Sequence, residues 1–82
     1  MSWNYRVLRT VSNGKEHYDI RGVFYRSGGE IKNQTAGPAS PYGDSLDALR
    51  WDLEAMLTAL PKPVLEEVKD GNRTTLKEVK NV

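Results

Sequence analysis

With 82 residues, 12 basic and 11 acidic side chains and a net charge of +1, the chain has room for one small domain and no overall charge that would steer it toward nucleic acid or anionic lipid. It has no cysteine, which excludes disulfides, cysteine nucleophiles and thiolate metal sites and favours a reducing, cytoplasmic setting. No apolar run is long enough to span a membrane, and the first residues lack the pattern of a secretory signal.

The N-terminal third of the chain predicts a β-hairpin with a definite register. Aromatic or aliphatic and polar side chains alternate at its start, and Asn13-Gly14 accepts the positive φ angles of a two-residue type I′ turn. If these two residues form the loop, Val7 faces Ile20. In that register one face collects six side chains, namely Trp3, Tyr5, Val7, Tyr18, Ile20 and Phe24. Because two patterns agree, we expect this face to point toward the core.

A third strand and the start of a helix are expected next. After a glycine-containing turn, residues 31–36 favour a weaker strand, and glycines and prolines then interrupt regular structure. Asp44 or Ser45 suits the N-cap of a helix. Asp47 places a negative charge in the first turn, where the helix dipole favours it.

The helix is expected to cover residues 46–60, because Pro61 and Pro63 end it. At 100° per residue, six large side chains fall within about 100° of one another. They form an apolar stripe of Leu46, Leu49, Leu53, Met56, Leu57 and Leu60. The stripe and the apolar hairpin face can cover each other. The predicted fold is therefore α+β, a three-stranded antiparallel meander packed on one amphipathic helix.

The last twenty residues allow two interpretations. Residues 62–65 favour a short fourth strand, and Asp70-Gly71-Asn72 could turn a second hairpin. The same segment has few large apolar side chains. We therefore expect one domain over residues 1–65 and a C-terminal tail over residues 66–82 that is either disordered or a weak hairpin.

Three stretches resemble a family of short bacterial proteins without a known activity: residues 3–7 (WNYRV), residues 40–51 (SPYGDSLDALRW) and residues 62–65 (KPVL). The resemblance extends over residues 3–65. More loosely, the strand order followed by GDSLDAL at residues 43–49 is similar to the N-terminal half of HicB-like antitoxins. That resemblance implies a partial RNase H-like fold and a small protein partner, although their usual Pro-Gly-Cys-like segment is missing here.

Catalytic chemistry has one weak candidate. His17 is the only histidine, and Asp19 follows two residues later on the same face of the predicted strand. A general base needs an orienting partner and a pocket, whereas a solvated histidine near a hairpin end is the simpler interpretation. No glycine-rich phosphate loop is present. We expect a protein that is not an enzyme and that uses neither a cofactor nor a metal.

The opposite face of the predicted sheet offers a nucleic-acid surface. An open sheet with basic and aromatic side chains can hold phosphates and stack bases. The candidates are Arg6, Arg21, Tyr25 and Lys32. Asp19 and Glu30 share this face, and Leu8 and Val23 dilute it, so an ordinary solvated sheet face is the competing interpretation.

Trp51 is the sharpest clue to function. It lies opposite the centre of the apolar stripe, with Ala48, Ala55 and Thr58 around it. An exposed tryptophan leaves a large apolar area in water, so either residues 64–68 of the same chain or a second molecule should cover it. We therefore expect a protein-interaction module that associates with itself or another protein through these four residues. The alternative is a weak RNA-binding domain.

Overall fold

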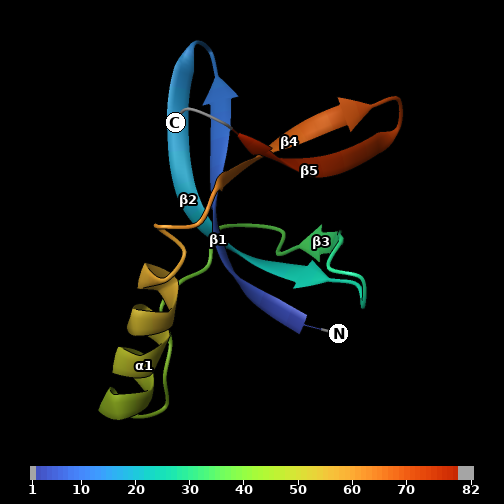
Figure 1. Cartoon of the computed structure of the whole chain (residues 1–82). Coiled ribbons are helices and arrows are strands. Elements are labelled where there is room, and N and C mark those ends of the chain that lie inside the picture. The colour runs from blue at the N-terminus through green and yellow to red at the C-terminus, as the bar shows by residue number, and fades with distance from the viewer. Residues whose placement is uncertain (1, 80–82) are drawn as a thin grey trace.

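The computed structural model describes residues 2–79 as a five-stranded mixed sheet with one helix (Figure 1). Its elements are β1 (Ser2–Ser12), β2 (Lys15–Tyr25), β3 (Ile31–Gln34), α1 (Leu46–Leu57), β4 (Val64–Asp70) and β5 (Arg73–Val79). The strand order is β3-β2-β1-β4-β5, in which β1 and β4 are parallel and the other neighbours are antiparallel. The α+β class is confirmed. The meander of β1, β2 and β3 is present, but two further strands extend it.

The predicted hairpin register is confirmed along the whole of β1 and β2. Asn13 and Gly14 have φ angles of 53° and 78°, as a type I′ turn requires. Val7 pairs with Ile20, and Ser12 pairs with Lys15 next to the turn. The six apolar side chains of the predicted face therefore do lie on one side of the hairpin.

The C-terminal segment forms the hairpin that the sequence left as one of two alternatives. β4 and β5 are paired along their whole length, from Val64 opposite Val79 to Asp70 opposite Arg73. A two-residue turn joins them, and its Gly71 has a φ angle of 65°. A glycine with positive φ at the first central position suits a type II′ turn. β4 also pairs in parallel with β1 next to Leu65, which is buried. The ordered domain therefore extends to Val79, and residues 80–82 of the predicted tail lie outside the described residues.

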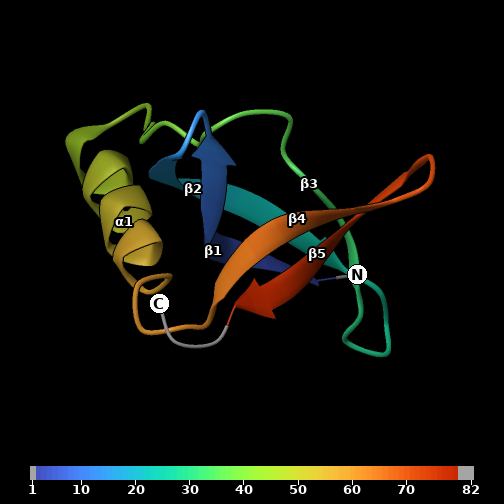
Figure 2. The ribbon, with the colours of Figure 1, turned by 90° about the horizontal axis from the view of Figure 1, so that it is seen from above.

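The sheet curls around a core on the face that was expected to be solvated. Leu8, Val23 and Leu65 form the buried cluster, and Tyr25, Ile31 and Leu76 pack against it. The curl is shown by Gln34 on β3, whose Nε2 donates to Glu67 Oε1 on β4 at 2.9 Å, although β2 and β1 separate these strands within the sheet. A register shift between β2 and β3 contributes to the bend. Figure 2 shows β4 and β5 crossing over the β1–β2 hairpin.

The helix lies on the other, convex face. Ser45 is its N-cap, with its hydroxyl accepting from the Ala48 N–H at 3.1 Å, and Asp47 lies in the first turn as predicted. The regular helix ends at Leu57, three residues before the predicted end. Shorter-range bonds such as Leu60 N–H to Leu57 O, at 3.2 Å, continue the coil for another turn.

Arg6 connects four parts of the curled sheet. Its side chain on β1 donates to Tyr25 Oη on β2 at 3.0 Å and to the Pro63 carbonyl, just before β4, at 2.8 Å. Glu78 on β5 lies 3.4 Å from the same guanidinium. Arg6 is only 8% exposed. A planar group with several fixed donors can serve these acceptors at once, which a single ammonium cannot do.

Replacing this buried guanidinium tests whether it holds the curl together. We expect Arg6→Lys to lower the free energy of unfolding by about 1.5–3 kcal/mol, because charge-assisted hydrogen bonds to buried acceptors are lost. Chemical denaturation measures the loss. Arg50→Lys is the matched control, since Arg50 is exposed and should change stability by less than about 0.5 kcal/mol. Equal effects of the two substitutions would contradict this role for Arg6.

Candidate functional site

Large apolar side chains on and beside α1 are exposed to solvent. Their exposed fractions are 73% for Leu46, 67% for Trp51, 45% for Leu53, 62% for Leu57 and 63% for Leu60. A small domain seldom leaves so many large apolar groups together on one element unless something covers them. The helix is therefore the first candidate for a functional surface.

The helix is rotated about its axis relative to the sequence prediction. Met56 is its buried residue, and Ala59 in the turn that follows is buried as well. Ala48, Leu49, Asp52 and Ala55 are half-buried. At 100° per residue, this buried side lies roughly 100° from the centre of the leucines. The expectation that the apolar stripe faces the sheet is therefore wrong for Leu46, Leu53, Leu57 and Leu60, which are exposed.

Asp52 fixes this rotation. Its Oδ1 accepts from the Tyr5 hydroxyl on β1 at 2.6 Å, and its Oδ2 accepts from the Tyr42 backbone N–H at 2.9 Å. The hydrogen bond with the carboxylate, with burial and charge repulsion adding to it, raises the pKa of Tyr5 to about 12. The same bonds lower the pKa of Asp52, so the carboxylate stays ionised. One side of the helix is thus attached to the sheet and to the loop before it.

That loop passes very close to the helix. A Cβ on Gly43 would clash with the backbone of Ala48 and Leu49, so only glycine fits there. The close approach places the Tyr42 N–H where it can reach Asp52. The loop and β1 therefore hold the same carboxylate from two directions.

The rotation opens a groove beside the helix on the sheet face. The groove has a volume of about 370 Å³, and its walls are the apolar side chains of Ile20, Leu53, Met56, Leu57 and Leu60. Leu53, Leu57 and Leu60 form its exposed rim. This surface was not predicted. The spacing of the leucines, which are placed symmetrically before and after Leu53, could have indicated it.

The predicted Trp51 surface lies on the other flank of α1. Trp51 is exposed, whereas Ala48 and Ala55 are half-buried and Thr58 caps the helix. Trp51 also lines a shallow hollow of about 480 Å³ with Tyr5, Tyr42 and Asp52, among others. Residues 64–68, the predicted cover, belong to β4 instead. Within the described part of the chain, Trp51 therefore stays largely uncovered.

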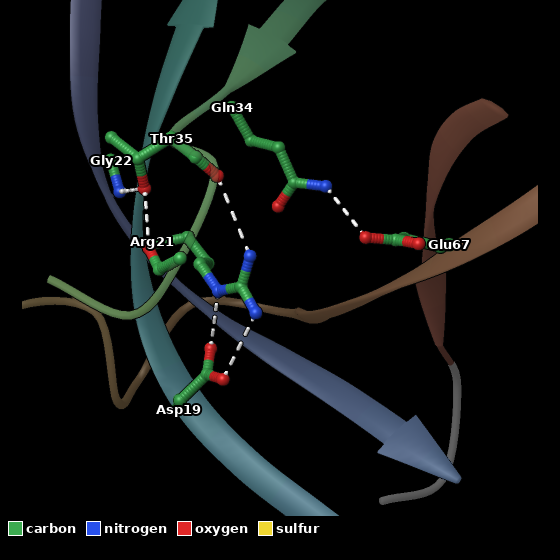
Figure 3. Close-up of polar contacts among 7 residues, drawn as sticks. Asp19, Arg21, Gly22, Gln34, Thr35 and Glu67 are labelled. Carbon is green, nitrogen blue, oxygen red and sulfur yellow. Dashed lines mark hydrogen bonds and ion pairs between the residues drawn. The ribbon is translucent and has the colours of Figure 1, made fainter. Parts of the chain in front are cut away.

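The predicted nucleic-acid residues do not form an exposed surface. Arg6 is buried, and Tyr25 donates its hydroxyl to Asn4 Oδ1 at 2.6 Å inside the curl. Arg21 forms a two-pronged ion pair with Asp19, at 2.7 and 3.2 Å (Figure 3). Lys32 alone is exposed. The side chains of Arg6, Arg21 and Tyr25 serve the interior, because the face that carries them is the concave one.

The His17–Asp19 pair is not assembled. His17 is exposed near the end of the hairpin, and both Asp19 oxygens accept from Arg21. In residues 2–79, no group of three histidine, aspartate or glutamate side chains is placed to share a metal ion. The arrangement gives no support to a general base at His17.

Comparison with known proteins found no match among family models, curated proteins or solved structures. The resemblance to short bacterial proteins and to HicB-like antitoxins therefore stays a prediction. Within the described residues, no helix is long and apolar enough to cross a membrane.

The Tyr5–Asp52 bond makes a prediction about pH. Folding raises the pKa of Tyr5 from 10.0 to about 12. The contribution of the Tyr5 hydroxyl to the free energy of unfolding is therefore complete below about pH 10 and is lost as the pH rises toward 12. Asp52, with a lowered pKa, contributes above its ordinary value of 3.8 and loses its contribution as the pH falls below it. The stability difference between the wild type and Tyr5→Phe should therefore be greatest between these limits.

Denaturation at a series of pH values measures this difference, and an ultraviolet phenolate titration shows the group directly. Tyr5→Phe should remove the phenol that ionises near pH 12, whereas Tyr42→Phe should leave it in place, because Tyr42 bonds Asp52 through its backbone. A stability difference that stays constant from neutral pH to pH 12 would show that the bond does not form in solution.

Proposed function

We propose that this domain is a protein-interaction module that associates with a second copy of itself through the leucines of the apolar stripe. The observation that carries the proposal is the exposure of Leu46, Leu53, Leu57 and Leu60 along one side of α1 and its final turn. The proposal keeps the predicted class of function and moves the main contact from Trp51 to the leucine flank.

The leucine spacing favours a second copy over an unrelated partner. Leu46 and Leu60 lie seven residues before and after Leu53, and Leu49 and Leu57 lie four residues before and after it. The pattern is therefore the same in both chain directions. In an antiparallel pair of helices with a two-fold axis at Leu53, each of these leucines faces a leucine of the other copy. Self-complementarity of this kind is what a two-fold interface needs.

The groove and the small core support the same arrangement. Leucine side chains of the second copy would enter the groove beside Ile20 and Met56, as ridges of one helix enter the grooves of another. The described residues include only six buried apolar residues. Domains with so little core often gain stability by association.

Leu53→Glu tests the proposal. A charge at the two-fold axis meets its own copy, so we expect sedimentation equilibrium to give a dimer for the wild type and a monomer for the variant. Far-ultraviolet circular dichroism should be unchanged, because Leu53 is partly exposed within one chain.

Trp51→Glu is the matched control, since it makes the same change on the opposite flank of α1 and should leave the dimer intact. A wild type that is monomeric throughout the accessible concentrations would refute self-association. Dissociation by Trp51→Glu alone would return the contact to the surface of Ala48, Trp51, Ala55 and Thr58.

A further inference from the structure

A second surface lies between the two edge strands of the sheet. β3 and β5 end the strand order, and the curl brings them toward each other, on the side of the molecule away from α1 (Figures 1 and 2). A cleft of about 400 Å³ lies between them, which we name the edge cleft; it is lined by Arg26 and by residues 31–34 and 73–76. Side chains of a strand alternate between the two faces of the sheet. A cleft that is lined by consecutive residues of a strand therefore lies along the backbone edge of that strand and not over one face.

The backbone groups of both edges are directed into the edge cleft. Thr35 N–H donates to Gly22 O on β2 at 2.9 Å, so by alternation the Gln34 N–H points away from β2. On β5, Arg73 pairs with Asp70 to close the two-residue turn, and the next amide, that of Thr74, therefore points away from β4. Such rows of free backbone groups are templates for another strand.

The edge cleft is positively charged. Arg26, Lys32 and Arg73 line it, and its lining contains no acidic residue. Among the side chains that the structure describes, no salt bridge joins any of these three cations to a carboxylate. A ligand with negative charge therefore fits the edge cleft by charge complementarity.

A buried acceptor lies at the same place. Gln34 Nε2 is held by Glu67, while its Oε1 is buried and has no donor among the described residues (Figure 3). Reversing the amide would bring its oxygen against the Glu67 carboxylate, so the orientation is fixed. A buried acceptor without a donor is costly.

We propose that the edge cleft binds an extended, acidic peptide segment of a partner protein, which adds as a sixth strand between β3 and β5. Backbone hydrogen bonds would supply affinity, and the three cations would select acidic side chains. The lining contains no aromatic side chain on which bases could stack, which favours a peptide over single-stranded nucleic acid. The proposal is independent of self-association through α1.

The test uses a fluorescent hexapeptide of alternating glutamate and valine, with a lysine–valine hexapeptide for comparison, and fluorescence anisotropy as the readout. We expect the acidic peptide to bind at least about tenfold more tightly than the basic one, and Arg73→Glu to weaken it about tenfold. Lys15→Glu is the matched control, because it makes the same charge change in an exposed residue at the far hairpin turn. It should leave the affinity unchanged.

Hydrogen exchange on the wild-type protein tests strand addition without any variant. The amides of Gln34 and Thr74 should exchange more slowly when the acidic peptide is bound. Binding without this protection, an equal loss in Lys15→Glu, or no binding of the acidic peptide would each overturn the proposal. An oligouridylate that binds more tightly than the peptide and is lost in Arg73→Glu would overturn it in favour of nucleic acid.

Discussion

The two hydrogen bonds that Asp52 accepts, from the Tyr5 hydroxyl and the Tyr42 backbone, decide which side of the helix meets the sheet. The close passage of Gly43 over the helix backbone holds the second of these donors in place. Met56 and Ala59 then reach the interior, while the leucines turn outward. The ionised carboxylate held by two donors thus fixes a rotation of the helix that leaves four leucines exposed within one chain. This arrangement is reasonable if a second copy supplies their cover.

The curl of the sheet creates the edge cleft, and it too depends on a polar side chain that joins distant parts of the chain. Arg6 joins β1 to β2, to the residue before β4 and to β5, and Leu8, Val23 and Leu65 fill the space around it. The sheet bends far enough to bring its edges together, but it does not close. One chain therefore leaves two surfaces without a partner, the leucine flank of α1 and the edge cleft between β3 and β5. The first is apolar and favours a second copy, and the second is basic and favours an acidic strand.

Local patterns predicted local structure well, and the errors lie where distant groups meet. The Asn13-Gly14 turn settled the register of β1 and β2, because the turn geometry acts on its immediate neighbours. Leu8 and Val23 look like interruptions of an alternating strand, yet they are the core of the concave face. A strand covered on both sides carries apolar residues on both. Their cover includes Leu65, whose parallel pairing with β1 joins residues far apart in the chain.

The candidate site was predicted only in part for a related reason. The outward position of Trp51 was expected, and its exposure within one chain was one of two alternatives, but the exposure of the leucines was not expected. Counting apolar residues around a helix assumes that the largest apolar side faces the core. The polar contact from Tyr5 to Asp52 overrides that assumption, and nothing local in the sequence marks these two residues as partners.

Because the chain has no cysteine, one introduced thiol can test the two-fold axis at Leu53 directly. A disulfide requires a separation of about 4.4–6.8 Å between its two Cα atoms. In an antiparallel helix pair centred at residue 53, the two Cα atoms of Leu53→Cys would lie that close. Mild oxidation followed by non-reducing electrophoresis should therefore yield a covalent dimer quickly and nearly completely. Trp51→Cys, on the far flank, should stay monomeric under the same oxidation. Rapid cross-linking through Trp51→Cys, with none through Leu53→Cys, would contradict the account.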